Sequence, residues 1–70
     1  MFGTELKRLR LKAGLTQEQV AARAKVTREY VSMLEAGKYV PTIEVFIRLV
    51  RAVDASPSEV IATVERSLVE

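Results

Sequence analysis

Apolar residues recur along the chain at intervals of three and four positions, the spacing of a helix that buries one face. The first stripe of this kind consists of Phe2, Leu6, Leu9 and Ala13. Gly14 follows it and can adopt the left-handed conformation that ends many helices. No segment shows the sustained alternation of a strand, and no Asn-Gly or Asp-Gly pair marks a hairpin. The pattern therefore predicts an all-α chain of five short helices, the first over about residues 2–13.

Residues that cap helices stand before each of the other four stripes. They are Thr16, Thr27, Thr42 and Ser56. Two of them are followed three positions later by Gln or Glu, which completes a capping box, and Pro57 fits the first position of a helix. These signals predict helices at about 16–24 and 27–35, a fourth from Thr42 to Asp54, and a fifth from Ser56 onward.

The chain contains neither cysteine nor histidine, which narrows its chemistry. Disulfides, zinc sites and Cys–His nucleophile pairs are excluded. The nine acidic residues are scattered, so we expect no metal site, no cofactor and no catalytic step. No apolar run is long enough to cross a bilayer, and charges begin at Glu5, too early for the apolar core of a signal peptide. We therefore expect a cytoplasmic protein, associated with a prokaryotic nucleoid or a phage, and not an enzyme.

Charge is distributed unevenly along the chain, whose net charge is +2. Residues 1–40 contain eight Lys and Arg against four Glu, a balance of +4. Residues 41–70 contain three Arg against five acidic residues, a balance of −2. A basic stretch of this kind favours a polyanion as partner, although a solvated surface of mixed charge has the same composition.

The helices predicted at 16–24 and 27–35 are separated by a turn of only a few residues. Ala21 provides a small side chain where two such helices would cross closely. Two short helices joined in this way form a helix-turn-helix, whose second helix enters the major groove of DNA. The spacing therefore favours duplex DNA as the polyanion.

A family resemblance appears in the helix-turn-helix and in the segments after it. The matching segments are 14–21 (GLTQEQVA), 26–38 (VTREYVSMLEAGK), 41–43 (PTI) and 49–53 (LVRAV). In this combination the chain resembles the phage-repressor (Cro/CI-like, lambda-repressor-like) family of helix-turn-helix domains over about residues 3–61. The resemblance implies a compact five-helix, lambda-repressor-like fold with operator DNA as its ligand.

The resemblance also implies roles for individual residues. Base edges would be contacted by Arg28, Glu29, Ser32 and Met33. Phosphates would be contacted by Gln17, Lys38 and Tyr39. To these backbone contacts we add Lys25, Thr27 and Tyr30, which lie in the turn and at the rim of the second helix of the motif. Arg10 and Glu35 would form an ion pair that ties the first helix to the end of the third. This pair is either buried and bidentate or exposed.

The base-contacting residues each allow a second interpretation. Arg28 can bind guanine O6 and N7, or it can bind a phosphate or remain solvated. Glu29 can accept a hydrogen bond from a cytosine amino group or can orient Arg28 by pairing with it. Ser32 can donate to a base or simply permit close approach. Met33 can meet a thymine methyl group or pack against the loop that follows.

Two positions depart from the family pattern, because Lys25 and Asp54 stand where glycine is common. A left-handed lysine costs roughly 1 kcal/mol, whereas aspartate tolerates that conformation better. Lys25 gains in return if a phosphate lies nearby. Structural interpretations also stay open for Gln17, as a favourable first-turn residue, and for Tyr30, as a residue packed onto the preceding helix.

The last predicted helix carries a broad apolar face. Its stripe consists of Val60, Ile61, Val64 and Leu68. We expect these residues, with the end of the fourth helix, to join two copies around a two-fold axis, unless the helix only covers its own domain. The chain is then one domain over residues 1–70, with a DNA-binding half at 1–40 and a half at 41–70 for the core and dimerisation.

Together these features predict a sequence-specific DNA-binding transcriptional regulator, a repressor, that binds a palindromic operator as a homodimer. The half-sites of such operators lie about one helical turn apart, roughly 34 Å. The alternative is an antitoxin or a protein-interaction module whose main partner is a protein. An enzyme such as a nuclease is disfavoured because the sequence contains no cluster of catalytic groups.

Overall fold

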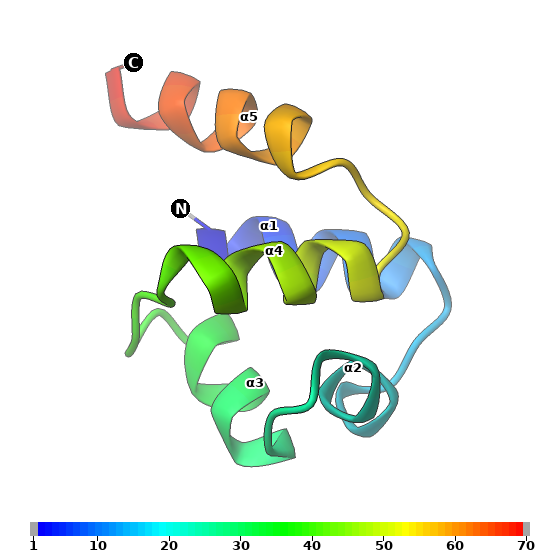
Figure 1. Cartoon of the computed structure of the whole chain (residues 1–70). Helices are drawn as coiled ribbons and strands as arrows, with labels where there is room; N and C mark the ends of the chain where they lie inside the picture. The colour runs from blue at the N-terminus through cyan, green and yellow to red at the C-terminus, as the bar shows by residue number, and fades with distance from the viewer. Residues whose placement is uncertain (1, 70) are drawn as a thin grey trace.

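The computed structural model describes residues 2–69, and every regular element in that range is a helix (Figure 1). The five helices are α1 (Phe2–Lys12), α2 (Gln17–Ala24), α3 (Arg28–Glu35), α4 (Ile43–Ala52) and α5 (Pro57–Val69). The prediction of an all-α fold with five helices is confirmed, and α1 ends one residue earlier than expected. None of the helices in the described range is long and apolar enough to cross a membrane.

Threonine side chains cap the starts of three helices. The capping box at α2 is complete, because Thr16 Oγ1 accepts from the Gln19 amide at 3.1 Å while Gln19 Oε1 accepts from the Thr16 amide at 2.9 Å. The Thr27 and Thr42 hydroxyls accept from the amides three residues later, at 3.0 and 3.3 Å. Pro57 is the first residue of α5, as predicted.

Four helices end with the same backbone conformation, a left-handed residue after the last turn. Their terminal left-handed residues are Gly14, Lys25, Gly37 and Asp54, with φ between 60° and 79°. In each case the next amide reaches back five residues to a helical carbonyl, at 2.9–3.1 Å, as in a Schellman motif. The left-handed conformations expected for Gly14, Lys25 and Asp54 are therefore confirmed.

The residue after each left-handed position is apolar in three of the four turns. Leu15, Val26 and Ala55 are partly buried and pack against the main core, so each anchors its turn. The fourth such position, at the end of α3, holds Lys38, which is exposed. The end of α3 therefore lacks the apolar anchor that the other three helix ends have.

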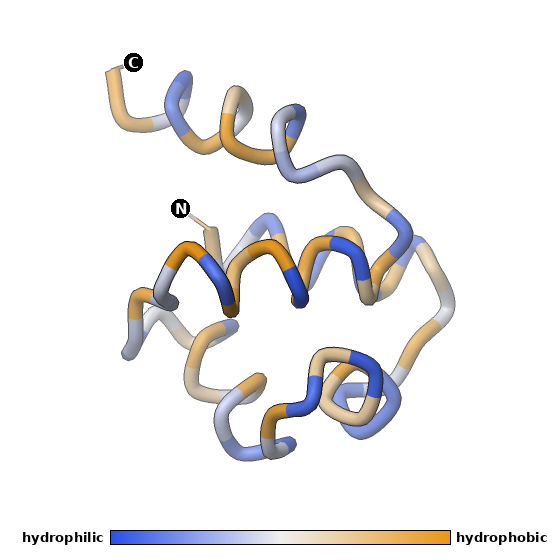
Figure 2. Tube along the Cα trace, in the orientation of Figure 1, coloured by the Kyte–Doolittle hydropathy of each residue, from blue (hydrophilic) through white to orange (hydrophobic). Residues whose placement is uncertain are grey.

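The core consists of two clusters that meet at Phe2 and Leu9 of α1 and at Ala55, before α5. The larger cluster is formed by α1 to α4 and the segment that follows α4, and contains Leu6, Val20, Ala21, Ala24, Val31, Leu34, Leu49, Ala52 and Val53. The smaller joins α4 to α5 and contains Phe46, Val50 and Val60. Figure 2 shows the alternation of apolar and polar residues along α4 and α5 that this packing requires. The core therefore fixes α2 and α3 on the scaffold of α1 and α4.

Two arginines cross-link the C-terminal end of α2 to α4. Arg48 Nε donates to the carbonyl of Ala24, the last residue of α2, at 3.0 Å. Arg23 Nη1 donates to the carbonyl of Ala52, the last residue of α4, also at 3.0 Å. Each helix thus satisfies a terminal carbonyl of the other, where a cation is also favoured by the helix dipole.

Candidate nucleic-acid interface

The helix-turn-helix is formed by α2, the turn at residues 25–27, and α3. Figure 1 places these two helices on one side of α1 and α4, with α5 on the other side, in agreement with the helix contacts α2·α4, α1·α3 and α4·α5. Val31 and Leu34 bury one face of α3 in the core. The opposite face of α3 is therefore free to enter a groove of DNA.

This free face of α3, the recognition face, carries the residues predicted to contact bases. They are Arg28, Glu29, Ser32 and Met33, of which Ser32 is half-buried and the others are exposed. Arg28 Nη2 lies 3.7 Å from Glu29 Oε2, which is the pairing considered for Glu29. Both side chains are well exposed, so the pair contributes little to stability and can open when DNA binds.

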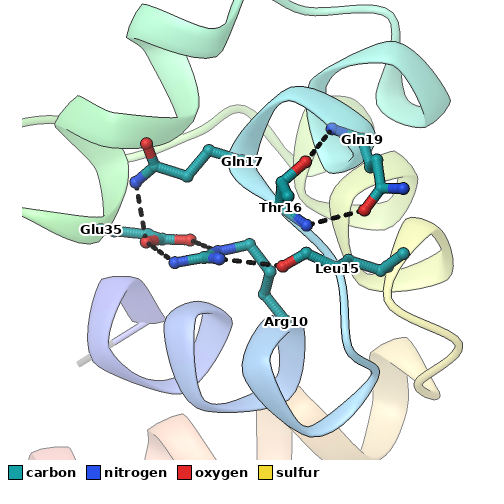
Figure 3. A network of polar contacts seen from close by, with 6 residues as sticks. All are labelled: Arg10, Leu15, Thr16, Gln17, Gln19 and Glu35. Carbon is teal, nitrogen blue, oxygen red and sulfur yellow. Dashed lines mark hydrogen bonds and ion pairs between the residues drawn. The ribbon is translucent and has the colours of Figure 1, made fainter.

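Arg10 and Glu35 form a buried, bidentate ion pair between α1 and the end of α3 (Figure 3). Arg10 Nε donates to Glu35 Oε2 at 2.7 Å and Nη2 donates to Oε1 at 3.1 Å. The two side chains are only 10% and 4% exposed. The hydrogen bond to Glu35 raises the pKa of the Arg10 guanidinium above its usual range, so Arg10 stays charged. Arg10 Nη1 also donates to the Leu15 carbonyl at 2.9 Å, which ties the α1–α2 turn to the same site.

Gln17, the first residue of α2, belongs to this network as well. Its Nε2 donates to Glu35 Oε1 at 3.1 Å (Figure 3). Because a carboxylate can only accept, Glu35 requires the amide nitrogen of Gln17 to face it. The second N–H of that nitrogen has no use in this bond and can donate to another acceptor, such as a phosphate. Sequence reasoning missed this contact, since nothing local to either residue indicates that they meet.

The residues predicted to contact the DNA backbone lie in α3 and in the turns before and after it, apart from Gln17. Lys25 is exposed in the turn before α3, and Lys38 is exposed after it. The Thr27 hydroxyl accepts from the Tyr30 amide, which leaves its own proton free to donate. Tyr30 is half-buried and packs against the main core, and the ring of Tyr39 stacks on it with the centroids 5.9 Å apart. The stack was not predicted, because the two rings are nine positions apart across a loop.

A second surface, the apolar groove, lies between α5, the start of α4 and the loop before α4. It is lined by Phe2, Val40, Pro41, Ile43, Phe46, Ile61, Val64, Glu65 and Leu68. Three of the four residues predicted for a dimer interface line this groove: Ile61, Val64 and Leu68.

The assignments of Val60 and of the end of α4 to that interface need correction. Val60 is only 3% exposed, because it packs against Phe46 and Val50 of its own chain. Ala52 and Val53, at the end of α4, are likewise buried in the main core. The apolar surface that stays exposed is therefore formed by the outer face of α5 and by the start of α4.

The fold and this arrangement define a small helix-turn-helix DNA-binding domain. Its second motif helix is held by the core and by a buried ion pair, and it presents polar side chains to solvent. The model of the helix-turn-helix domain family matches residues 1–62, and the chain belongs to that family.

Relatives that match most of the chain agree with this assignment. The chain is 34% identical over 67 residues to y4dJ, an uncharacterised HTH-type transcriptional regulator of Sinorhizobium fredii; the match covers 96% of this chain and 87% of that protein. It is also 34% identical over 67 residues to an uncharacterised HTH-type transcriptional regulator of Archaeoglobus fulgidus, covering 96% and 94%. The protein is accordingly a helix-turn-helix transcriptional regulator that binds DNA.

Solved structures show the same fold. The restriction-modification controller protein C.AhdI of Aeromonas hydrophila superposes with a TM-score of 0.80 at 34% identity, covering 84% of this chain and 89% of that chain. The clp gene regulator ClgR of Corynebacterium glutamicum superposes with a TM-score of 0.88 at 26% identity, covering 97% and 72%. The lambda-repressor-like fold expected from the sequence is therefore confirmed.

Proposed function

We propose that this regulator is a sequence-specific repressor that binds a palindromic operator as a homodimer, with α3 in the major groove. The observation that carries the proposal is the two-sidedness of α3, which buries Val31 and Leu34 and exposes the recognition face. Repression needs only occupancy of the operator, so the DNA interface and a dimer contact suffice for it.

The recognition face supplies sequence selectivity in this proposal. Arg28 donates to guanine O6 and N7, and Glu29 holds the guanidinium in place until the base pair is engaged. Ser32 donates to a base edge or allows the helix to approach closely, and Met33 meets a thymine methyl group. Arg28 and Met33 would contribute most to sequence selectivity, because guanine O6 and N7 are hydrogen-bond acceptors whereas the thymine methyl group is apolar.

Contacts to phosphates set the register of α3 on the duplex. Gln17 donates its free N–H, together with the amides at the start of α2, to one phosphate. The other contacts to the DNA backbone come from Lys25, Thr27, Tyr30 and Lys38, and Tyr39 follows Lys38 in the same loop. These contacts add affinity for every sequence alike and make binding depend on salt.

The apolar groove supports the homodimer. Eight of its nine lining residues carry no charge, and Ile61 and Leu68 are 46% and 67% exposed. An exposed apolar patch that polar residues surround can mark an interface with another protein. Because α5 lies on the far side of α1 and α4 from α2 and α3 (Figure 1), pairing through α5 leaves both recognition faces free. For both copies of α3 to bind one operator, the two-fold axis must bring them to successive turns of the duplex, roughly 34 Å apart.

Selection of bound sequences from random duplex DNA, at a stated salt concentration, tests this proposal. We expect an enriched inverted repeat whose half-sites are about one helical turn apart. No enriched sequence, even at low salt, would refute sequence-specific binding.

The apolar groove also favours a second candidate, a module whose main partner is another protein. In that case Arg28→Ala and Gln17→Ala would leave the biological activity intact. Substitutions in the groove would then abolish it. The first candidate predicts the loss of activity in both DNA-facing variants.

A further inference from the structure

The loop after α3 is held differently from the other helix ends. At the three other Schellman turns an apolar residue packs against the core directly after the left-handed position. At the end of α3 that position is the exposed Lys38, although its amide still donates to the Met33 carbonyl at 2.9 Å. The backbone turn is therefore present, but the apolar anchor is missing.

An aromatic stack one residue further along takes the place of that anchor. The rings of Tyr30 and Tyr39 are 5.9 Å apart between centroids and inclined by 19°, a favourable stacked arrangement. Tyr30 is itself packed against the main core, so it is the fixed half of the pair. Tyr39 is 51% exposed, and the next residue, Val40, is 89% exposed. Between Gly37 and Pro41 the stack is thus the main side-chain anchor of the loop.

We propose that Tyr39 is a positioning residue, whose ring, stacked on Tyr30, holds the loop so that Lys38 can contact a DNA phosphate. This inference rests on the proposed DNA binding and refines it, because it assigns the effect of Tyr39 to its ring and not to its hydroxyl. The stack links the loop to the recognition helix itself, since Tyr30 belongs to α3. Base contacts and the Lys38 phosphate contact then engage as one rigid unit.

The test compares three variants on the selected operator over a range of salt concentrations. Lys38→Ala should weaken binding roughly tenfold, the loss expected for one charge-assisted contact. It should also reduce the slope of log affinity against log salt by about 0.9 for each bound protomer. Tyr39→Leu removes no charge, yet it should reproduce both changes, because the lysine is no longer held in place. Tyr39→Phe keeps the ring and should rescue both the affinity and the slope.

A double variant provides the decisive control. Tyr39→Leu added to Lys38→Ala should have no further effect, because both substitutions remove the same contact. Circular dichroism of each variant checks that the helices are intact.

Three results would overturn the inference. Tyr39→Phe could lose affinity as Tyr39→Leu does, which would assign the effect to the hydroxyl. Tyr39→Leu could leave the salt slope unchanged. The effects of Lys38→Ala and Tyr39→Leu could add in the double variant. Failure of the wild-type protein to select any sequence would instead refute the proposed function, so the two failures are distinguishable.

Discussion

At the scale of single residues, the turn before α3 combines a strained backbone with a charge directed to solvent. Lys25 has φ 60° and ψ 45°, and its side chain is exposed. A lysine in this conformation costs roughly 1 kcal/mol relative to glycine. The same φ of 60° recurs at Asp54, at the end of α4 and away from the recognition face. The two residues therefore form a matched pair in which only Lys25 lies directly before α3.

Lys25→Gly should raise the free energy of unfolding by about 0.5–1 kcal/mol, because glycine relieves the left-handed strain. It should also weaken DNA binding and lower the salt slope by about 0.9 per protomer. Urea denaturation and DNA titrations measure the two effects. The control, Asp54→Gly, should leave DNA affinity unchanged. A Lys25→Gly protein that binds DNA as tightly as the wild type would show that Lys25 makes no phosphate contact.

Gly3 shows what the sequence alone could not reveal. It is buried, and a Cβ built on it would overlap the backbone carbonyl of Leu34 in α3. In the sequence it is only a poor helix former near the start of a helix. Its importance depends on the distance between α1 and α3, which no local pattern encodes.

Gly3→Ala should therefore destabilise the fold by about 1–3 kcal/mol, since the obstacle is backbone and α1 must move away from α3. Thr4→Ala, at the neighbouring exposed position, should change stability little. Thermal unfolding of both variants makes the comparison. Equal midpoints for Gly3→Ala and the wild type would show that α1 can shift without cost.

At the scale of elements, the caps and the apolar stripes were enough to place all five helices. The Thr16 capping box, the threonines before α3 and α4, and Pro57 at the start of α5 each mark a boundary that the structure has. Contacts between elements were harder to predict. The Gln17–Glu35 hydrogen bond, the Tyr30–Tyr39 stack and the Arg23 and Arg48 cross-links join residues 9 to 29 positions apart. Such contacts depend on the packing of helices, which periodicity does not specify.

Variants of the buried Arg10–Glu35 pair should separate its effect on stability from its effect on DNA binding. Glu35→Ala leaves a buried guanidinium without its carboxylate and should cost about 3 kcal/mol of stability. The double variant Arg10→Met, Glu35→Leu removes both charges and should recover most of that loss. It should nevertheless bind DNA more weakly than the wild type, because Gln17 loses the carboxylate that orients its amide. Chemical denaturation and DNA titration give the two readouts. Wild-type affinity in the double variant would contradict this role for Glu35.

At the scale of the whole molecule, the proposed DNA-binding and dimerisation helices lie on opposite sides of the α1–α4 scaffold. The helix-turn-helix lies on one side and α5 on the other (Figure 1). The sequence identified the apolar face of α5 but could not divide it between the core and a partner. The structure separates the buried part of this face from its exposed part, since Val60 is buried and Leu68 is 67% exposed.

Leu68→Glu should convert a dimer into a monomer, because it places a charge in the apolar groove. Arg66→Glu is the matched control, since Arg66 is exposed on α5 and does not line the groove. Light scattering at equal concentrations reports the mass of each variant. A dimeric mass for both variants would place the dimer interface elsewhere.

Selection of the DNA sequence by the recognition face of α3 is what the proposed function depends on. The most direct measurement repeats the selection from random duplex DNA with Arg28→Ala and with Lys38→Ala, beside the wild type. Arg28→Ala should lose preference at one base pair of each half-site, at a cost of about 1–3 kcal/mol. Lys38→Ala should select the wild-type sequence with lower affinity. If Arg28→Ala selects the same sequence as the wild type with undiminished preference at every position, Arg28 does not contact a base and α3 does not read the operator as proposed.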